Sequence, residues 1–426
     1  MSDSTPTNSI LTRGVATILP APTGLAELMA ERPITLYLGI DPTGAFLHLG
    51  HLVVLRKLQQ FAEAGHRVIL LIGNGTVKIG DPTGRDSSRP VLTEAEIEAN
   101  FASWQDQASK VLDFSKIEIK RNGDWLDKLT FVDLVKLMAK TTVQQLIERD
   151  MFQDRIKKGQ PIFGHEIIYP LLQGYDSVAM DVDLEIGGTD QTFNMLMGRQ
   201  LQEAYHHHQK WVLTTPIING LDGRKMSKSF HNFVALTDSA NDMYGKLMSL
   251  ADDQILEYFT LLTDVPDTEI IAMRKAMADG ANPMEFKKHL ALTITTQLHS
   301  PAAAATAAEH FQATIQDKVA PSDILIITTP AASATVLELV KLGTPELSNT
   351  EIRRLSEQGG VTLFEPPATA DSAIDSAANS SPSVGRKLSD PTEIITLKSR
   401  ATPITLKVGK KRWFQVKFAT MPASQK

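Results

Sequence analysis

The sequence of 426 residues contains no cysteine. Disulfides, thiolate metal sites and a cysteine nucleophile are therefore excluded. Long apolar runs are also missing, since Val68–Ile72 is typical of the longest and a membrane span needs about 18 residues. The opening stretch MSDSTPTNSI lacks a basic segment followed by an apolar one, so no secretory leader is predicted. We expect a cytoplasmic protein that does not contact a membrane.

The composition indicates a folded chain with an uneven charge distribution. Hydrophobic residues make up 42% of the chain and charged residues 22%, which suffices for a sizeable core. The length predicts roughly two to four domains. From residue 385 onward ten basic residues face two acidic ones, which gives +8 and leaves −14 on the rest of a chain whose total is −6. Such a basic region indicates either a polyanion site, with RNA or DNA as the leading ligands, or a solubilising tail.

The first clear pattern is a strand, a turn and a helix followed by another strand. Residues 34–41 read as a buried strand that ends in the turn 41–44, and leucines at spacing three over 49–61 predict a helix. The run 68–73 is apolar, as in a strand buried on both faces. This order predicts an α/β protein with a parallel sheet. Neither G-x-G-x-x-G nor a P-loop occurs, so the two common nucleotide fingerprints do not apply.

Helical periodicity dominates the chain after this unit. We expect helices over 95–112 and 131–149, a sheet strand over 181–186 with a helix after it, and successive helices from 238 to 310. Residues 366–385 are rich in Ala, Ser and Pro, which is typical of a flexible insertion. Beyond them, 393–398 and 404–418 alternate as strands do.

The segment His48-Leu49-Gly50-His51 lies where the loop after the first strand enters its helix. A helix N-terminus presents unpaired N–H groups and the positive end of its dipole, which suits a phosphate. Gly50 would let a nucleotide approach the backbone, and the two imidazoles, three residues apart, can face one ligand. Two ordinary surface histidines would give the same pattern.

The pentapeptide KMSKS, residues 225–229, is more specific. Its two lysines are spaced by three on a loop that also contains Gly220 and Gly223. They can reach a transferring polyphosphate as point charges. A solvated basic turn is the alternative interpretation.

Together the two segments resemble the HIGH and KMSKS signatures of class I aminoacyl-tRNA synthetases. Five stretches narrow the resemblance to the tyrosyl-tRNA synthetase family, and it covers most of residues 34–235. These stretches are LYLGIDPTGAFLHLGHL (36–52), GDPTGR (80–85), YPLLQGYD (169–176), EIGGTDQ (185–191) and KMSKS (225–229). The resemblance implies a Rossmann-like catalytic domain that uses ATP to activate L-tyrosine as tyrosyl-adenylate, releasing pyrophosphate. The tyrosine would then pass to the 3′-terminal ribose of tRNA(Tyr).

The resemblance implies a tyrosine pocket. Tyr37 and Asp176 would bind the phenolic hydroxyl, and Asp81, Tyr169 and Gln173 the α-ammonium group. Tyr169, Gln173 and Asp176 fall at i, i+4 and i+7, so one helix would present them on one face. Burying partners for a hydroxyl rejects phenylalanine by about 10⁴–10⁵, which is the known behaviour of this enzyme family. The residues implied in tyrosine binding are Tyr37, Asp81, Tyr169, Gln173, Asp176 and Gln191.

The resemblance also implies an ATP site. The substrate carboxylate is already nucleophilic, so catalysis would rest on positioning and on charge stabilisation of the leaving pyrophosphate. Mg²⁺ would arrive with ATP, and no protein metal ligands are expected. The implied catalytic residues are Thr43, His48, His51, Arg85, Arg89, Lys225 and Lys228. The implied ATP-binding residues are Gly39, Asp41, His48, Gly50, His51, Gly188, Asp190, Lys225 and Lys228, with Asp190 as acceptor for a ribose hydroxyl.

The remaining expectations concern domains and partners. We expect an extension over 1–33, the catalytic domain over 34–235 and a helical anticodon-binding domain over 236–325. A small α+β domain over 335–426, with a flexible insertion at about 366–385, resembles the S4 RNA-binding domain through SNTEIRRLSEQGGVTL and LKVGKKRWFQVKF. Trp413 and Phe414 in the second stretch would either pack in the core, which is favoured, or stack on a base. The resemblance also implies a homodimer. Residues placed to meet tRNA phosphates are Arg353, Arg354, Lys410, Lys411 and Arg412.

Some features leave alternatives open. Glu185 stands where many family members carry Gln, and Leu38 replaces a residue that is often small or polar, so the fine geometry of the pocket is not fixed. The run His206–His208 could indicate a metal, but no carboxylate partner is identifiable in the sequence and a solvated loop is favoured. The rival functions are a tryptophan–tRNA ligase, a small-molecule adenylyltransferase and a catalytically silent RNA-binding regulator.

Overall fold

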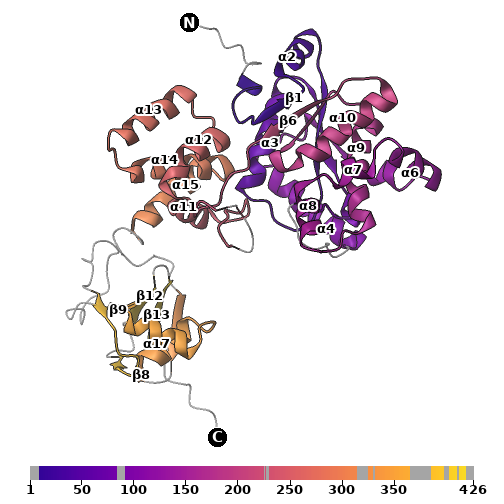
Figure 1. Ribbon diagram of the computed structural model, residues 1–426. Coiled ribbons are helices and arrows are strands. Elements are labelled where there is room, and N and C mark those ends of the chain that lie inside the picture. The colour runs from indigo at the N-terminus through magenta and orange to yellow at the C-terminus, as the bar shows by residue number, and fades with distance from the viewer. Residues whose placement is uncertain are drawn as a thin grey trace. The chain divides into compact units, whose positions relative to one another are not determined.

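The computed structural model of the chain forms two compact units, residues 1–305 and residues 306–426 (Figure 1). The larger unit contains the α/β part and most of the helical part of the sequence, and the smaller unit contains the basic C-terminal region. The structure describes residues 9–83, 92–224, 226, 230–313, 325–329, 332–364, 385–397, 403–409 and 412–418.

A six-stranded sheet forms the centre of the larger unit, in the order β1-β6-β5-β2-β3-β4. All neighbouring strands are parallel except β1, which runs antiparallel to β6. The strands are β1 (Thr17–Leu19), β2 (Thr35–Ile40), β3 (Arg67–Ile72), β4 (Ile117–Arg121), β5 (Leu184–Gly188) and β6 (Trp211–Thr215). The predicted α/β class and the strands β2, β3 and β5 are confirmed, whereas β1, β4 and β6 had no clear signal in the sequence.

Helices cover both faces of this sheet, which explains why its central strands are apolar throughout. Leu36 and Leu38 of β2 pack in a core shared with α2, α3 and α4. Tyr37, between them, points to the opposite face. The helices here are α2 (Pro22–Glu31), α3 (Leu49–Glu63), α4 (Glu94–Ala108), α5 (Gly123–Leu126), α6 (Phe131–Met138), α7 (Val143–Ile147), α8 (Asp150–Lys157), α9 (Gly164–Met180) and α10 (Thr192–His206). The helix expected over 131–149 is thus divided between α6 and α7.

The sequence predicts successive helices from 238 to 310, and the structure has them. They are α11 (Ala240–Leu247), α12 (Ile255–Leu262), α13 (Asp267–Ala278), α14 (Pro283–Leu298) and α15 (Pro301–Phe311). No helix among the described residues is both long and apolar enough to cross a membrane.

The N-terminal segment is built into the larger unit. Arg13 donates to the main-chain oxygens of Phe259, Thr260, Thr263 and Val265 at 2.7–3.1 Å, at the end of α12. Buried Lys57 of α3 in turn donates to the carbonyl oxygens of Ile10 (2.8 Å) and Arg13 (2.7 Å). Residues before position 34, expected as an extension, therefore supply a sheet strand and a tie between the α/β and helical parts.

The smaller unit is a small α+β fold. Its main sheet has the order β10-β9-β12-β13-β7, and β11 pairs with β8. Its elements are β7 (Leu325–Thr329), β8 (Ser333–Thr335), α16 (Val336–Gly343), α17 (Asn349–Glu357), β9 (Val361–Phe364), β10 (Arg386–Lys387), β11 (Ile394–Thr396), β12 (Ile404–Val408) and β13 (Arg412–Phe418). Because β7 and β8 begin before residue 335, this fold includes residues ahead of the predicted start of the domain. Of the insertion expected at 366–385, only Gly385 is among the described residues.

The neighbouring aromatic residues Trp413 and Phe414 are buried to different extents. Phe414 is buried in the core of the smaller unit, and its ring lies 2.4 Å from where a Cβ on Gly343 would stand. Trp413 is half-buried, with its ring centroid 5.1 Å from that of Phe364. The prediction of core packing is confirmed for Phe414, and Trp413 packs against a neighbouring aromatic ring at the surface of the sheet.

Candidate active site

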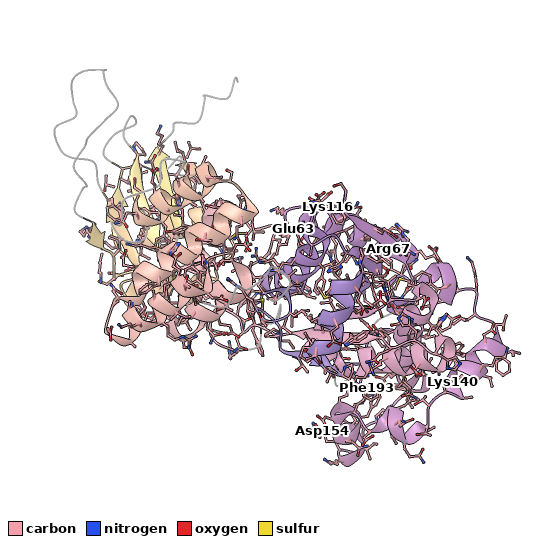
Figure 2. All side chains as sticks on the ribbon, turned by 90° about the horizontal axis from the view of Figure 1, so that it is seen from above. Glu63, Arg67, Lys116, Lys140, Asp154 and Phe193 are labelled. Atoms are coloured by element: carbon pink, nitrogen blue, oxygen red, sulfur yellow. The ribbon has the colours of Figure 1, made fainter. Side chains whose placement is uncertain are left out.

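A cavity of about 410 Å³ opens at the carboxyl ends of β2, β3 and β5, with α9 along one side. In parallel α/β sheets this edge is where ligands bind. Figure 2 separates the two ends of the sheet: Glu63, Arg67 and Lys116 lie on the amino-end side, and Phe193, in the first turn of α10, lies on the other side. Residues 38–41 of β2 and its loop, Gly73 after β3, and 185–188 of β5 all line the cavity.

The two histidines of the first signature begin helix α3 and line this cavity. The Nδ1 atom of His48 accepts the Gly50 N–H at 3.1 Å, and the Nδ1 atom of His51 accepts the His48 N–H at 3.1 Å. An Nδ1 atom that accepts a hydrogen bond does not carry the proton, so each neutral ring carries it on Nε2. The ring centroids are 4.0 Å apart. The predicted placement of this segment at a helix N-terminus is confirmed.

The second signature adjoins the first. Met226, the one residue of KMSKS among those the structure describes, has its Sδ atom 3.4 Å from where a Cβ on Gly50 would stand. Just beyond it, the backbone pairs with the start of α3 through Leu49 N to Val234 O (3.1 Å) and Leu236 N to Leu47 O (3.0 Å). Four predicted phosphate ligands, Lys225, Lys228, Arg85 and Arg89, lie outside the described residues.

Helix α9 presents three predicted tyrosine ligands to the cavity. Tyr169, Gln173 and Asp176 all line it, so the predicted shared helical face is confirmed. The Asp176 carboxylate is buried and accepts hydrogen bonds from Trp125 Nε1 at 2.8 Å and Asn122 Nδ2 at 3.1 Å. Burial raises the pKa of Asp176 well above its usual range, and these two donors oppose the rise.

A second group of acceptors surrounds Asp41. Its carboxylate accepts from Tyr169 Oη at 2.9 Å and from Thr76 Oγ1 at 2.7 Å. Burial, assisted by Asp41, raises the pKa of Tyr169, so its hydroxyl remains a donor. Asp81 lies nearby and accepts from Gln191 Nε2 at 2.9 Å and from the Thr83 backbone N–H at 2.9 Å. Both carboxylates line the cavity, where an ammonium group would find negative charge.

For Tyr37 the predicted contact with the substrate hydroxyl stays a prediction. Its side chain is fully buried and is not among the residues that line the cavity. Its hydroxyl instead shares a hydrogen bond of 2.9 Å with Ser177 Oγ. Tyr37 lies on the same face of β2 as Gly39, which lines the cavity, and it packs with Ile69 and Leu71, of which Leu71 also lines the cavity. Of the two residues predicted to bind the phenolic hydroxyl, Asp176 lines the cavity wall.

Glu185 brings a carboxylate to the cavity wall, and its charge is matched. The Lys210 ammonium group, which is 0% exposed, forms an ion pair with Glu185 Oε2. Burial lowers the pKa of Lys210, and Glu185 opposes that shift. The other oxygen of Glu185 accepts from Gln173 Nε2 at 3.1 Å. Leu38, the second departure from the family pattern, also lines the cavity.

The remaining predicted ligands border the cavity or lie at its rim. Gly39, Thr43, Gly188 and Gln191 line it. Asp190 is exposed in the short 3₁₀ helix η2 (Thr189–Gln191), and its Oδ1 lies 2.7 Å from where a Cβ on Gly188 would stand. Asp190 is thus next to a cavity glycine without itself lining the wall.

The described part of the cavity wall is negatively charged. Four carboxylates, from Asp41, Asp81, Asp176 and Glu185, line the cavity, and no Lys or Arg of the described chain does. Within the described ranges no group of three or more His, Asp or Glu side chains could hold a metal ion. His208 does have carboxylate partners that the sequence did not reveal, since its ring nitrogens lie 3.2 Å from both Asp181 and Asp183.

Two residues that support the cavity wall lacked a recognisable signal in the sequence. Asn122 bridges Asp176 and Thr76 Oγ1 (2.9 Å) directly after β4, a strand that was not predicted. Buried Arg149 donates to Thr83 Oγ1 at 2.7 Å and so supports the loop that carries Asp81. A polar residue that follows a parallel strand is a weak signal for the Asn122 position. Arg149 lies inside a helical pattern and had no signal.

The predicted RNA contacts lie in the smaller unit. Arg353 and Arg354 are exposed on α17, and Arg412 is exposed at the start of β13, 3.2 Å from Glu346. Lys410 and Lys411 are outside the described residues.

Comparison with known proteins agrees with this site. A family model described as tRNA synthetases class I (W and Y) matches residues 29–316. The chain is 44% identical to tyrosine–tRNA ligase 2 of Photorhabdus laumondii, over 81% of this chain and 89% of that protein. It is also 44% identical to the tyrosine–tRNA ligase of Symbiobacterium thermophilum, over 90% of each. A crystal structure of a truncated mitochondrial tyrosyl-tRNA synthetase from Coccidioides posadasii shares the fold, with a TM-score of 0.60, 22% identity, and coverage of 72% of this chain and 92% of that one.

These matches cover most of the chain, and they agree with a parallel sheet whose cavity joins a histidine-capped helix to buried carboxylates. The chain therefore belongs to the class I aminoacyl-tRNA synthetases of the tryptophan and tyrosine group. Within that group, the relatives of 44% identity place it in the tyrosine–tRNA ligase family.

Proposed function

We propose that the cavity is the adenylation site through which this chain carries out its family's reaction, the ATP-dependent attachment of L-tyrosine to tRNA. The single observation that carries the proposal is the shared cavity of His48, His51 and the α9 residues, with Met226 beside Gly50. One half of the cavity suits an aromatic amino acid and the other a triphosphate.

The phenol end of the substrate would meet Asp176. Asn122 and Trp125 hold this carboxylate in place, which leaves an oxygen lone pair for the substrate hydroxyl. Phenylalanine would bury the same carboxylate without a hydroxyl to pair with it. The loss of that bond favours tyrosine over phenylalanine without a separate editing step.

The ammonium end would lie near Asp81, Tyr169 and Gln173. These groups line the same cavity as Asp176 and the histidines at the start of α3. The carboxylates of Asp41 and Asp81 make this region negative, which favours the ammonium group over other substituents. The substrate carboxylate would then point toward the histidines and the bound nucleotide.

The nucleotide end would use the N-terminus of α3. Thr43, His48, Gly50 and His51 would border the phosphates and nucleoside, and Asp190 at the rim would accept from a ribose hydroxyl. The substrate carboxylate would attack the α-phosphorus in line, and pyrophosphate would leave. Lys225, Lys228, Arg85 and Arg89 remain the proposed cations for that leaving group.

Mg²⁺ would be bound by the phosphates of ATP. The lining carboxylates Asp41, Asp81 and Asp176 already accept hydrogen bonds from protein donors, so they do not form an open set of metal ligands. A magnesium ion keeps several waters and is commonly carried by substrate phosphates, where it would neutralise charge on the leaving group.

The smaller unit would contact tRNA. Arg353, Arg354 and Arg412 expose guanidinium groups there, and Lys410 and Lys411 belong to the same basic region. Such groups contact phosphate oxygens without reading sequence. The helical residues 236–325 would contact the anticodon, and the protein would act in the cytoplasm.

A homodimer would cover an apolar patch on α6 and α7. Phe131, Val132, Val135, Met138 and Val143 are exposed, Phe131 to 80%. Helix α6 lies at the outer edge of the larger unit (Figure 1). A clustered patch of this kind on a soluble surface marks a protein interface, so we propose that two copies of the chain meet here.

The experiment that tests the proposed function is amino-acid-dependent exchange of pyrophosphate into ATP. We expect exchange with tyrosine, and none with tryptophan or phenylalanine at equal concentration, followed by charging of tRNA(Tyr) in a second assay. Exchange that depends on tryptophan would indicate a tryptophan–tRNA ligase. Exchange without tRNA charging would indicate a small-molecule adenylyltransferase, and no exchange at all would indicate an RNA-binding regulator.

A further inference from the structure

A fully buried lysine without an assigned role lies behind the amino-acid half of the cavity. Lys210 immediately precedes β6, and its side chain is 0% exposed. Its ammonium group forms the ion pair with Glu185 and donates to Ser177 Oγ at 2.8 Å and to the Met195 carbonyl oxygen at 3.1 Å. These three acceptors match the three N–H donors of an ammonium group, so the site is built for a charged lysine.

The neighbouring helices leave room for this ammonium group only because a glycine faces it. A Cβ on Gly198 of α10 would stand 2.5 Å from Lys210 Nζ and 2.6 Å from Ser177 Oγ. Ser177 in turn shares a hydrogen bond with Tyr37. The lysine therefore connects α9, α10, β2 and β5 at one point behind the cavity.

From Lys210 a chain of two contacts leads to the cavity wall. Glu185 uses one carboxylate oxygen for Lys210 and the other for Gln173 Nε2. Because the amide nitrogen of Gln173 is bound on the protein side, its carbonyl oxygen is the end of the amide that remains for the cavity. An amide oxygen accepts from an ammonium group, whereas an amide nitrogen would repel it.

We propose that Lys210 is a positioning residue for tyrosine, which acts through Glu185 to keep the carbonyl oxygen of Gln173 turned toward the substrate ammonium group. This rests on the proposed function, since it takes Gln173 as a ligand of the amino acid. Without Lys210, Glu185 is a buried charge without a counter-ion, and no donor holds its second oxygen in place. The Gln173 amide then loses a fixed acceptor for its N–H groups and turns them to the cavity.

The test compares Lys210→Met with the double variant Lys210→Met/Glu185→Gln. We expect Lys210→Met to raise the KM for tyrosine about tenfold to a hundredfold in pyrophosphate exchange, with the KM for ATP unchanged. The double variant should return the KM for tyrosine to within about threefold of wild type, because a glutamine at 185 needs no counter-ion and its oxygen still accepts from Gln173. Lys57→Met, which removes another buried lysine far from the cavity wall, is the matched control and should leave both constants unchanged.

Several results would overturn the proposal. The proposal is wrong if folded Lys210→Met keeps the wild-type KM for tyrosine, or if its KM values for tyrosine and for ATP rise equally. It is also wrong if the double variant has a KM for tyrosine as high as that of Lys210→Met. Should Lys210→Met fail to fold, tyrosine binding to the double variant by equilibrium dialysis decides, with weak binding counting against the proposal. Failure of the proposed function is separate, because wild-type protein would then show no tyrosine-dependent exchange.

Discussion

Replacement of Asp176 by asparagine probes the end of the pocket where the substrate hydroxyl is recognised. The change keeps the size of the side chain and removes its charge. A hydrogen bond to a charged partner contributes about 1.5–3 kcal/mol. The new amide has one oxygen for two donors, Trp125 and Asn122. This mismatch is present with and without substrate, so it lowers the stability of the protein and not its relative affinity for substrate. The lost bond to the substrate alone corresponds to a decrease of about tenfold to a hundredfold in kcat/KM for tyrosine.

The assay is pyrophosphate exchange at varied tyrosine and at varied ATP, with phenylalanine as the competing substrate. We expect the KM for ATP to be unchanged and the preference for tyrosine over phenylalanine to fall by about the same tenfold to hundredfold, since phenylalanine never made the lost bond. Asp154→Asn, the same change at an exposed position of α8, is the matched control and should behave as wild type. A decrease of less than threefold with tyrosine, or a parallel loss for ATP, would refute the assignment of Asp176 to the substrate.

Three further predictions test other parts of the structure. Gly50→Ala should lower the adenylation rate about tenfold to a hundredfold at unchanged tyrosine affinity, because the new Cβ would stand 2.9 Å from the His48 ring. Rapid-quench kinetics measures this rate, and Gly245→Ala is the control because nothing lies within 4 Å of its new Cβ. Phe131→Asp should convert dimers to monomers in light scattering, whereas Ile271→Asp, at another exposed apolar position, on α13, should not; a dimer that survives Phe131→Asp would place the interface elsewhere. Burial lowers the pKa of Lys57 to about 8, so above that pH the unfolded chain binds more protons than the folded chain, and the free energy of unfolding rises with pH. Urea unfolding should show a gain of about 2 kcal/mol between pH 8 and pH 10 in wild type and not in Lys57→Met.

The parts of the fold that follow from the sequence are those with strong local patterns. Strands β2 and β3 are continuously apolar because both faces are covered, and α3 carries leucines on one face. Strands β1 and β10 are only three and two residues long, too short to show any period. Their pairing is decided by distant partners, which no local pattern contains.

In the active site, too, local sequence patterns predict some residues, whereas contacts between distant segments decide others. His48, Tyr169, Gln173 and Asp176 lie in compact motifs, and local helix geometry brings each to the cavity. Tyr37 shows the limit of this reasoning, because the sequence does not say how deeply a strand residue is buried or which partner its hydroxyl takes. Lys210 could not be found at all, since its role exists only through contacts with residues from α9, α10 and β5.

The antiparallel strand at the sheet edge also bears on how much of the polypeptide is needed for a stable enzyme. The family match begins at residue 29, but Thr17–Leu19 shields the main-chain groups of β6 from pairing with other molecules. A shortened chain that starts at residue 29 would leave the largely apolar edge strand Trp211–Thr215 unpaired. An unpaired edge strand can pair with a strand of another molecule, which leads to aggregation. The shortened chain would also lose the guanidinium group of Arg13 that ties down the end of α12. We therefore expect the smallest stable form of the larger unit to begin before residue 29, where the family model starts.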